Sequence, residues 1–349
     1  MNKILRLTLI LTFLLLVTGY DQPLADESSF YKGKIIRFIV PYSPGGLYDL
    51  HPRLLGRHIS KHIAGKPRII VQNMPGAGGS IGMNYLYNIS KPDGLTMAIV
   101  SKTAYVDQLV GRKGLAFDYT KFTWIGSIGK TAAFLSCRSD SPFNSIEKLL
   151  STADPAHLGV TGTGDIGYQF GIVAKMALSV NMKFVSGYPG GVDVDAALQR
   201  GEVDCRALGV SVLRGREPWR SWVKPGGFMT IVLQQGPKRE PDFPAVPTLY
   251  ELAPREAQPV LDVAGVLFAY SDFDRPFAAP PGLSPERTKI LRQAFLDTLN
   301  DPNYLKESKK LGFDSRHIGG VELEKVFKKL LRPSPAILEE VKKIVAGGK

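Results

Sequence analysis

The sequence is poor in the residues that most enzyme and metal sites require. It has five histidines and two cysteines in 349 residues, and the cysteines lie in no metal-type cluster. None of its glycine-rich loops fits Gly-x-x-x-x-Gly-Lys-Ser/Thr, which excludes a Walker-type nucleotide site. No residues stand out as a nucleophile with its base. We therefore assign no catalytic residue, no cofactor and no metal ion.

Long apolar runs are also scarce, and the one that stands out lies at the start of the sequence. Lys3 and Arg6 precede an apolar run over residues 7–17, and polar residues with Gly19 and Ala25 follow. This order is typical of a signal peptide. The run is shorter than the ~20 residues that span a bilayer, and no cysteine follows it to carry a lipid. We expect residues 1–25 to be a cleaved leader and the mature protein to be secreted and free.

The charge is unevenly balanced, with 44 Lys and Arg against 32 Asp and Glu and a net charge of +12. The basic residues are scattered and form no stripe interleaved with aromatic residues, so we expect no nucleic-acid partner. Attraction of anionic ligands or membrane surfaces explains the excess more simply. The two cysteines, Cys137 and Cys205, are in a compartment where a bridge can form. Their spacing leaves a disulfide and two free thiols equally open.

Strand and helix patterns alternate twice along the chain. This order predicts two α/β units with right-handed crossovers and parallel strands, followed by a mostly helical tail. Strands are predicted over residues 35–40, 68–71, 96–100, 158–161 and 184–185, and helices over 50–63, 80–89, 167–178, 192–200 and 336–345. Ser284, followed by Pro285, is expected to cap a further helix, and Asp301, followed by Pro302, to begin another that ends at Gly312.

Four glycine-rich loops each join a predicted strand to a predicted helix, at residues 44–46, 75–79, 162–164 and 189–191. Glycine allows positive φ and a close approach of the backbone, and the amides at the following helix end attract negative charge. A single loop of this kind is often only a tight turn. Four of them, distributed over both units, predict a site for an anion.

Two further motifs in the sequence could indicate a different kind of site. Residues 162–167 fit Gly-x-Gly-x-x-Gly, but residues 182–191 lack the acidic residue that a dinucleotide site places about twenty positions on. His58 and His62 have the i, i+4 spacing of a metal site, with no further ligand set beside them. Exposed histidines on a basic helix are the simpler interpretation.

Several longer motifs resemble the extracytoplasmic receptors of tripartite tricarboxylate transporters, over most of the mature chain. The motifs are Val-Pro-Tyr-Ser-Pro-Gly-Gly at 40–46 with Asp49 and Arg53, Val-Gln-Asn-Met-Pro-Gly-Ala-Gly-Gly at 71–79, Pro-Asp-Gly at 92–94, Tyr-Pro-Gly-Gly at 188–191, Gly-Glu-Val-Asp at 201–204 and Phe-Pro-Ala-Val-Pro-Thr-Leu at 243–249.

The resemblance implies a type II periplasmic binding protein fold, with two α/β lobes joined by two crossing strands and a ligand cleft between them. Residues 26–133 and 231–349 would form the first lobe, and residues 134–230 the second. Carried over from the family, the ligand-binding residues would be Tyr42, Gly45, Gly46, Leu47, Tyr48, Asp49, Thr103, Gly164, Asp165, Tyr188, Gly190 and Gly191.

Two of these residues depart from the family pattern, because Leu47 and Asp165 stand where a hydroxyl residue is usual. Leu47 forms an apolar wall of the cleft, together with Tyr48, or packs into its own lobe. Asp165 either caps the following helix or faces the cleft, where its charge would repel a carboxylate by about 1 to 4 kcal/mol.

The resemblance implies a periplasmic solute-binding receptor, without enzymatic activity. It would capture a small organic anion, a carboxylate in the first place, and deliver it to the membrane subunits of a tripartite transporter. We expect a monomer whose lobes close on the ligand. Two alternatives stay open, a ligand sensor that feeds a signalling partner and a secreted enzyme with Asp49 or Asp165 as its general base.

Overall fold

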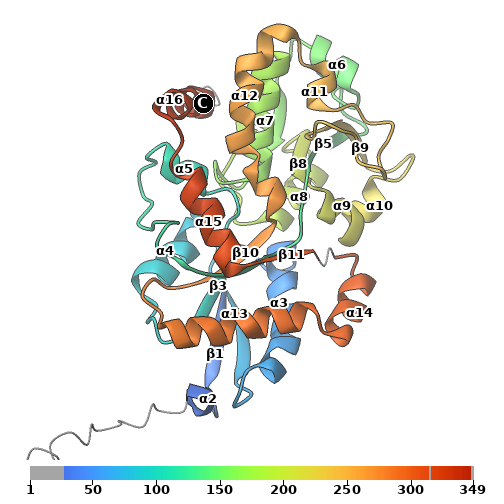
Figure 1. Ribbon diagram of the computed structural model, residues 1–349. Coiled ribbons are helices and arrows are strands. Elements are labelled where there is room, and N and C mark those ends of the chain that lie inside the picture. The colour runs from blue at the N-terminus through green and yellow to red at the C-terminus, as the bar shows by residue number, and fades with distance from the viewer. Residues whose placement is uncertain (1–26, 314–315, 347–349) are drawn as a thin grey trace, which may run out of the picture.

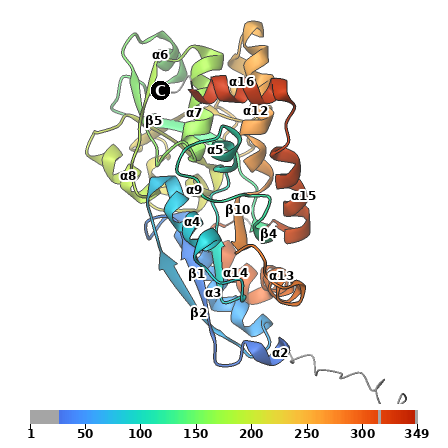
Figure 2. The same cartoon turned by 90° about the vertical axis from the view of Figure 1, so that its left-hand side faces the viewer.

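The computed structural model describes residues 27–313 and 316–346, and the predicted signal peptide, residues 1–25, falls outside this part of the chain. Two sheets, each flanked by helices, form two lobes that lie one above the other (Figure 1). A view turned by 90° shows the same two lobes (Figure 2). Within the described residues, no helix has the length and apolar character that a membrane crossing requires.

The first lobe is built on a six-stranded sheet with the order β11-β4-β10-β3-β1-β2. The strands β1, β2 and β3 are parallel, as predicted, whereas β10 is antiparallel to β3 and β4, and β11 is antiparallel to β4. The bounds are β1 Ile35–Val40, β2 Arg68–Asn73, β3 Thr96–Ile99, β4 Thr123–Ile128, β10 Arg275–Ala279 and β11 His317–Gly319.

Helices cover both faces of this sheet because its central strands are apolar on both sides. In β1, Phe38 and Val40 share a core with helices α3 and α13, while Ile39 belongs to the core under α4 and α15. Ser284 caps α13 and Asp301 caps α14, as predicted. The bounds are α2 Glu27–Phe30, α3 Leu47–Ile59, α4 Ser80–Asn88, α5 Tyr105–Leu109, α13 Pro285–Leu299, α14 Pro302–Lys310 and α15 Gly320–Leu330.

The second lobe is built on a five-stranded sheet with the order β7-β6-β8-β5-β9. Its strands β6, β7 and β8 are parallel, and β5 runs antiparallel to both β8 and β9. The bounds are β5 Ala133–Arg138, β6 Ala156–Gly159, β7 Met182–Val185, β8 Cys205–Gly209 and β9 Met229–Gln234. The helices on this sheet are α6 Ile146–Ser151, α7 Ile166–Leu178, α8 Gly191–Gln199, α9 Val210–Gly215, α10 Trp219–Trp222, α11 Leu249–Leu252, α12 Gln258–Leu267 and α16 Pro335–Ala346.

The chain passes between the two sheets at residues 129–132, after β4, and again at residues 268–274, before β10. The two passages are hydrogen-bonded to each other, since the Thr131 amide donates to the Ser271 carbonyl at 3.1 Å and the Asp274 amide to the Gly129 carbonyl at 3.0 Å. Two adjacent connections of this kind are suited to act as a hinge. A third passage, residues 331–334, leads from α15 to α16, which packs on α12 and α7.

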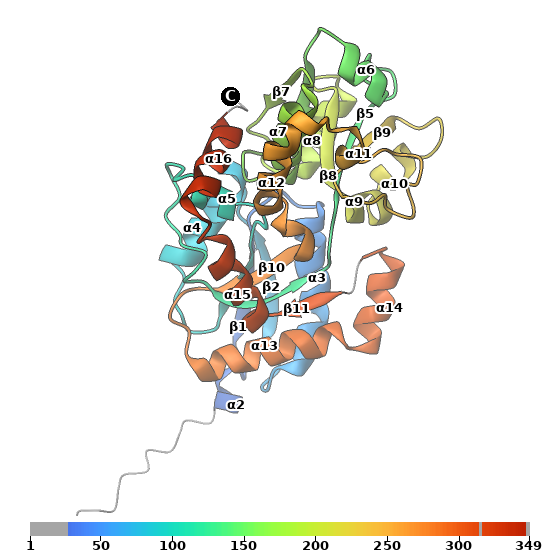
Figure 3. The ribbon, with the colours of Figure 1, turned by 45° about the horizontal axis from the view of Figure 1, so that its top comes forward.

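The predicted boundary between residues 230 and 231 falls inside β9, which pairs with β5 in the second sheet. Helices α11 and α12 pack on α7, and the C-terminal α16 packs on α12 and α7 beside the second lobe (Figure 3). We therefore propose a different division, with residues 133–267 and helix α16 in the second lobe. Contacts between distant segments decide this boundary, and a sequence motif does not reveal them.

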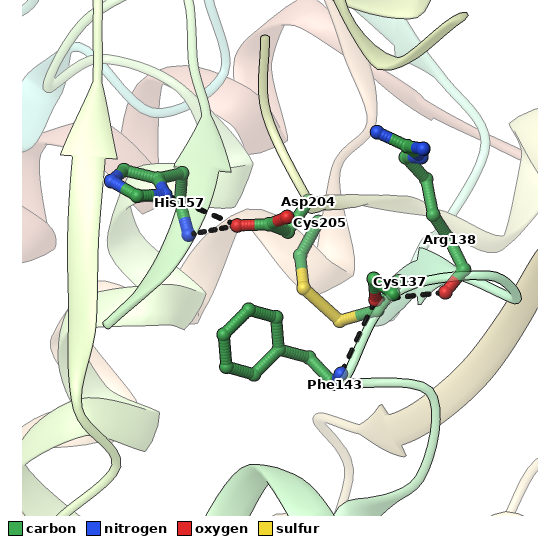
Figure 4. The surroundings of a disulfide bond; sticks show 7 residues. Cys137, Arg138, Phe143, His157, Asp204 and Cys205 are labelled. Carbon is green, nitrogen blue, oxygen red and sulfur yellow. Dashed lines mark hydrogen bonds and ion pairs between the residues drawn. A yellow bond between two sulfur atoms is a disulfide. The ribbon is translucent and has the colours of Figure 1, made fainter. Parts of the chain in front are cut away.

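A disulfide joins Cys137 and Cys205. The sequence had left a disulfide and two free thiols equally open. The two residues face each other on the adjacent antiparallel strands β5 and β8, and both are fully buried (Figure 4). The imidazole Nδ1 of His157 lies nearby, 3.1 Å from a carboxylate oxygen of Asp204. The disulfide closes a loop of 68 residues within the second lobe alone.

Candidate functional site

A cavity of about 90 Å³ lies between the two lobes. This is small beside the few hundred Å³ of a drug-sized pocket and suits a compact ligand. The residues that line the cavity come from both lobes. They are Tyr42, Ser43, Gly46, Leu47, Tyr48, Lys102, Thr103 and Arg275 from the first lobe, and Thr161, Gly164, Asp165, Ile166, Gly191, Arg206, Leu208, Gly209, Val212 and Arg216 from the second.

Two tyrosines form an aromatic wall on the side of the first lobe. The rings of Tyr42 and Tyr48 lie 4.7 Å apart, and the Arg275 guanidinium lies 5.7 Å from the Tyr48 ring centroid. The Tyr42 hydroxyl donates to the Gly78 carbonyl at 3.2 Å, and the Tyr48 hydroxyl accepts from the Lys102 amide at 3.1 Å. Burial raises the pKa of both phenols, so both stay neutral.

A buried charge cluster lies behind this wall, where the chain crosses between the lobes. The Asp274 carboxylate forms ion pairs with Lys102 and with Arg275. The hydroxyl of Ser211, from the second lobe, donates to Asp274 at 3.4 Å and accepts from Arg275 at 3.3 Å. Burial and the nearby Arg275 guanidinium lower the pKa of the Lys102 amine well below its usual range. An anion in the cavity would favour the charged form of Lys102.

A second charge cluster belongs wholly to the second lobe. The Asp195 carboxylate forms ion pairs with Arg206 and Arg216, and it accepts a hydrogen bond from the Trp219 indole at 2.7 Å. Arg206 also donates to the Gly191 carbonyl at 2.7 Å. Burial by itself raises the pKa of Asp195, but the two guanidinium groups outweigh it and hold this pKa below its usual range. Asp195 is therefore ionised at neutral pH.

The two clusters have the same composition, one carboxylate for two cationic side chains. All four cationic side chains line the cavity, whereas Asp195 and Asp274 do not. A buried charge without a partner is costly. When Lys102 is charged, each cluster therefore has one cation in excess and room for one further negative group, beside the Asp165 carboxylate that lines the same cavity. The cavity is thus built for an anion, and it presents cations from opposite lobes.

Asp165 has both of the roles that the sequence left open. It caps α7, since one carboxylate oxygen accepts from the Gly167 amide at 2.7 Å. The other oxygen accepts from the Thr161 amide at 2.9 Å and the Thr161 hydroxyl at 2.8 Å. The residue also lines the cavity. Its charge is held by three donors on its own loop, which reduces its repulsion of a bound anion.

The loops of the two lobes touch around the cavity. The Gly164 carbonyl accepts from the hydroxyls of Ser101 at 3.2 Å and Thr103 at 2.6 Å. The Gln169 amide donates to the Thr103 carbonyl at 2.9 Å. At Gly190 a β-carbon would lie 2.9 Å from the Ser43 amide nitrogen, so only glycine permits this approach of the two lobes. These contacts correspond to a closed arrangement.

The structure brings eight of the twelve predicted ligand-binding residues to the cavity. They are Tyr42, Gly46, Leu47, Tyr48, Thr103, Gly164, Asp165 and Gly191. Leu47 also packs into the core of its own lobe, so it satisfies both interpretations.

The other four predicted residues lie off the cavity wall: Gly45, Asp49, Tyr188 and Gly190. Asp49 is buried and its carboxylate is taken up by Gly45, Arg53 and Asn73, which makes it a brace of the first loop. Tyr188 is half-buried and packs against the apolar core. Gly190 contacts Ser43 across the entrance.

Sequence reasoning missed the four cationic side chains. Arg206 and Arg275 each stand in an otherwise apolar strand, Cys-Arg-Ala-Leu-Gly and Arg-Pro-Phe-Ala-Ala. A cation in such a strand is a usable signal, because a buried charge needs a partner. Lys102 follows β3, at the edge where parallel strands of α/β proteins place their ligands. Ser43, Thr161, Ile166, Leu208, Gly209 and Val212 complete the wall and carried no signal of their own.

Residues 78–82 fit the Gly-x-Ser-x-Gly pattern of a hydrolase elbow, which our sequence analysis overlooked. The serine, Ser80, begins α4 directly after the loop that follows β2. The His58 imidazole is hydrogen-bonded to the Glu307 carboxylate, and the His62 imidazole to the Asp301 carboxylate. His317 lies on β11, at the opposite edge of the sheet from β2. None of these three histidines is therefore placed as a base for Ser80.

Residues 53–342 match the tripartite tricarboxylate transporter family receptor. The chain belongs to this family. It is 25% identical over 324 residues to the UPF0065 protein in the gbd 5′ region of Cupriavidus necator. The match covers 92% of this chain and 91% of that protein. Over a shorter stretch of 99 residues it is 33% identical to the protein BugT of Bordetella pertussis, 28% of this chain and 29% of BugT.

Solved structures of similar fold include the periplasmic binding protein BugD, with a TM-score of 0.70, 22% identity and 90% of this chain covered against 98% of BugD. Another is MatC of Rhodopseudomonas palustris with bound malate, with a TM-score of 0.68, 20% identity and coverage of 89% and 99%. A further R. palustris protein, solved with adipate, has a TM-score of 0.69 and 20% identity, and the match covers 90% of this chain and 97% of that protein. These likenesses show the two-lobed fold of periplasmic binding proteins.

Proposed function

We propose that this receptor captures a small organic anion, a carboxylate in the first place, between its lobes in the periplasm and delivers it to the membrane subunits of a tripartite transporter. The observation that carries the proposal is the pair of charge clusters on opposite walls of one small cavity. Each places two basic side chains beside a single carboxylate. A bound negative group would favour the charged form of Lys102, so each cluster can accept one more negative group.

The family and its structural relatives support the choice of a carboxylate. MatC contains malate and the other R. palustris protein contains adipate, and both ligands carry two carboxylates. The two clusters of the present chain suit a compact ligand with two negative groups, one directed at Lys102 and Arg275 and the other at Arg206 and Arg216.

Ligand binding and lobe closure are coupled in this proposal. The two clusters lie on different lobes, so a ligand that contacts both stabilises the closed arrangement through contacts that the open one lacks. Ser211 reaches from the second lobe into the Asp274 cluster, which ties closure to the charge site. Closed receptor is the form that would dock on the transporter.

Calorimetry of the mature protein against mono-, di- and tricarboxylates tests the proposal. We expect a saturable site for a compact carboxylate, an increase in the unfolding temperature when it binds, and release of the ligand unchanged. A panel without binding and without thermal stabilisation would overturn the proposal. Turnover of the ligand would favour the enzyme alternative, with Asp165→Asn as the variant to examine.

A further inference from the structure

A second hollow lies outside the ligand cavity and carries a strong positive charge. It has a volume of about 1190 Å³, and its lining includes five cationic side chains: Arg112, Lys113, Lys175, Lys183 and Lys342. The single acidic residue in this lining, Asp107, is buried. We call this hollow the basic groove.

Most of the positive charge in the basic groove is not neutralised nearby. Arg112 pairs with Asp107 at 3.3 Å, and Lys342 pairs with Glu339 at 2.8 Å. Within residues 27–313 and 316–346, no carboxylate forms an ion pair with Lys113, Lys175 or Lys183. Three cations that line one hollow attract a polyanion and repel one another.

The basic groove is assembled from both lobes. Arg112 and Lys113 follow α5 of the first lobe, while Lys175 on α7 and Lys183 on β7 belong to the second. Between them the Asp107 carboxylate accepts from the Thr163 hydroxyl at 2.5 Å, a contact from one lobe to the other. Opening of the lobes would pull these two sides apart, so the complete groove exists in the closed arrangement.

One loop separates the basic groove from the ligand cavity. Thr161, Gly164 and Asp165 line the cavity, and Gly162 and Thr163 of the same loop line the groove. The groove can therefore respond to a ligand in the cavity without touching it.

We propose that the basic groove is a docking site for an acidic segment of a partner protein, which it binds when the lobes are closed. The inference rests on the proposed function for its closed state and for its partner, a membrane subunit of the transporter. Charge complementarity selects the acidic segment. The concave shape selects a polypeptide, because a flat lipid surface cannot follow lysines down into a hollow.

The test measures binding of a fluorescently labelled octaglutamate peptide by anisotropy, with octaglutamine as the uncharged probe. The groove variant is Lys113→Glu/Lys175→Glu/Lys183→Glu. Its matched control, Lys91→Glu/Lys289→Glu/Lys306→Glu, makes the same change of net charge at exposed lysines elsewhere. We expect the groove variant to lose about tenfold or more in affinity and the control about twofold at most, with strong weakening by salt.

A closed form is obtained by Ala104→Cys/Gly164→Cys, since a β-carbon at Gly164 would lie 3.4 Å from that of Ala104 across the two lobes, close to the separation in a disulfide. Octaglutamate should bind the oxidised variant more tightly than the reduced one. Equal affinities would overturn the dependence on closure.

Three results would overturn the docking proposal itself. They are an equal loss in the control variant, equal binding of octaglutamine, or binding of phosphatidylglycerol vesicles that the groove variant abolishes to the same degree. Carboxylate calorimetry separates the two proposals. A protein that binds carboxylate but not octaglutamate contradicts the docking site alone, and one that binds octaglutamate but no carboxylate contradicts the proposed function.

Discussion

In the first lobe Asp274 stands between Lys102 and Arg275, and in the second lobe Asp195 stands between Arg206 and Arg216. The two clusters match in composition and differ in position. The Asp274 cluster lies at the hinge and includes a contact with Ser211 of the other lobe. The Asp195 cluster lies within one lobe, is braced by Trp219, and moves with that lobe as a unit. When the lobes close, the Asp274 cluster regains its contact with Ser211. The Asp195 cluster keeps its internal contacts and moves with its lobe to the opposite side of the cavity.

Removal of the disulfide should have the largest effect on the difference between the lobes, because the disulfide stabilises only the second lobe. Closing 68 residues stabilises a domain by about 4 kcal/mol through the loss of unfolded-state entropy. We expect Cys137→Ala/Cys205→Ala to lower the free energy of urea unfolding by about that amount. Trp219 and Trp222 report on the second lobe and Trp124 on the first. A loss below about 1 kcal/mol would contradict the prediction.

Removal of the Asp195 charge should have the next largest effect. Asp195→Asn leaves two buried guanidinium groups without their counter-ion, which costs about 3 kcal/mol of stability. Because the pKa of Asp195 is lowered in the folded protein, its contribution is present above the unfolded pKa of about 4 and is lost as the pH falls through the folded value. Denaturation curves across pH 2 to 6 should show this loss for wild type and not for the variant.

Asp140→Asn is the matched control for Asp195→Asn. Asp140 also pairs with an arginine, Arg138 at 2.8 Å, but its side chain is 63% exposed. Exposed pairs contribute about 0 to 1 kcal/mol. Equal losses for the two variants would show that the Asp195 cluster is no more than a surface ion pair.

Single substitutions on each wall show whether both clusters bind the ligand. Arg206→Gln and Lys102→Gln each remove one cation and leave the carboxylate paired with the other. A charged hydrogen bond contributes about 1.5 to 3 kcal/mol, so carboxylate affinity should fall about tenfold to a hundredfold in each variant by calorimetry. Arg214→Gln, outside the cavity lining, serves as the control. A loss on one wall alone would reduce the site to a single anion position.

Asp165→Asn should give the smallest effect, with opposite signs for stability and affinity. Asparagine keeps the cap on α7 but loses a charged acceptor for Thr161, so stability should fall by about 1 kcal/mol or less. Carboxylate affinity should rise a few-fold, because a like charge leaves the cavity wall. Weaker binding would show that Asp165 contacts a donor group of the ligand.

The glycine loops could be predicted from the sequence, and the charged walls could not. A strand, a glycine loop and a helix are local signals, so Gly46, Gly164 and Gly191 were found directly. Arg275 begins β10, which pairs antiparallel with β3 and β4, and Arg216 follows α9 in the other lobe. Only the packing of these distant segments brings both side chains to one cavity. The boundary predicted near residue 230 cuts through β9, because that strand is defined by its pairing with the distant β5, which no local motif reveals.

The most direct test of the central claim compares a four-carbon dicarboxylate with its monoamide, at equal ionic strength, by calorimetry of the mature protein. The two ligands have nearly the same size and differ by one negative charge. If one anion goes to each cluster, the dicarboxylate binds about tenfold or more tightly than the monoamide, and Arg206→Gln narrows the difference. Equal affinities for the two ligands, or no binding of either, would contradict the account.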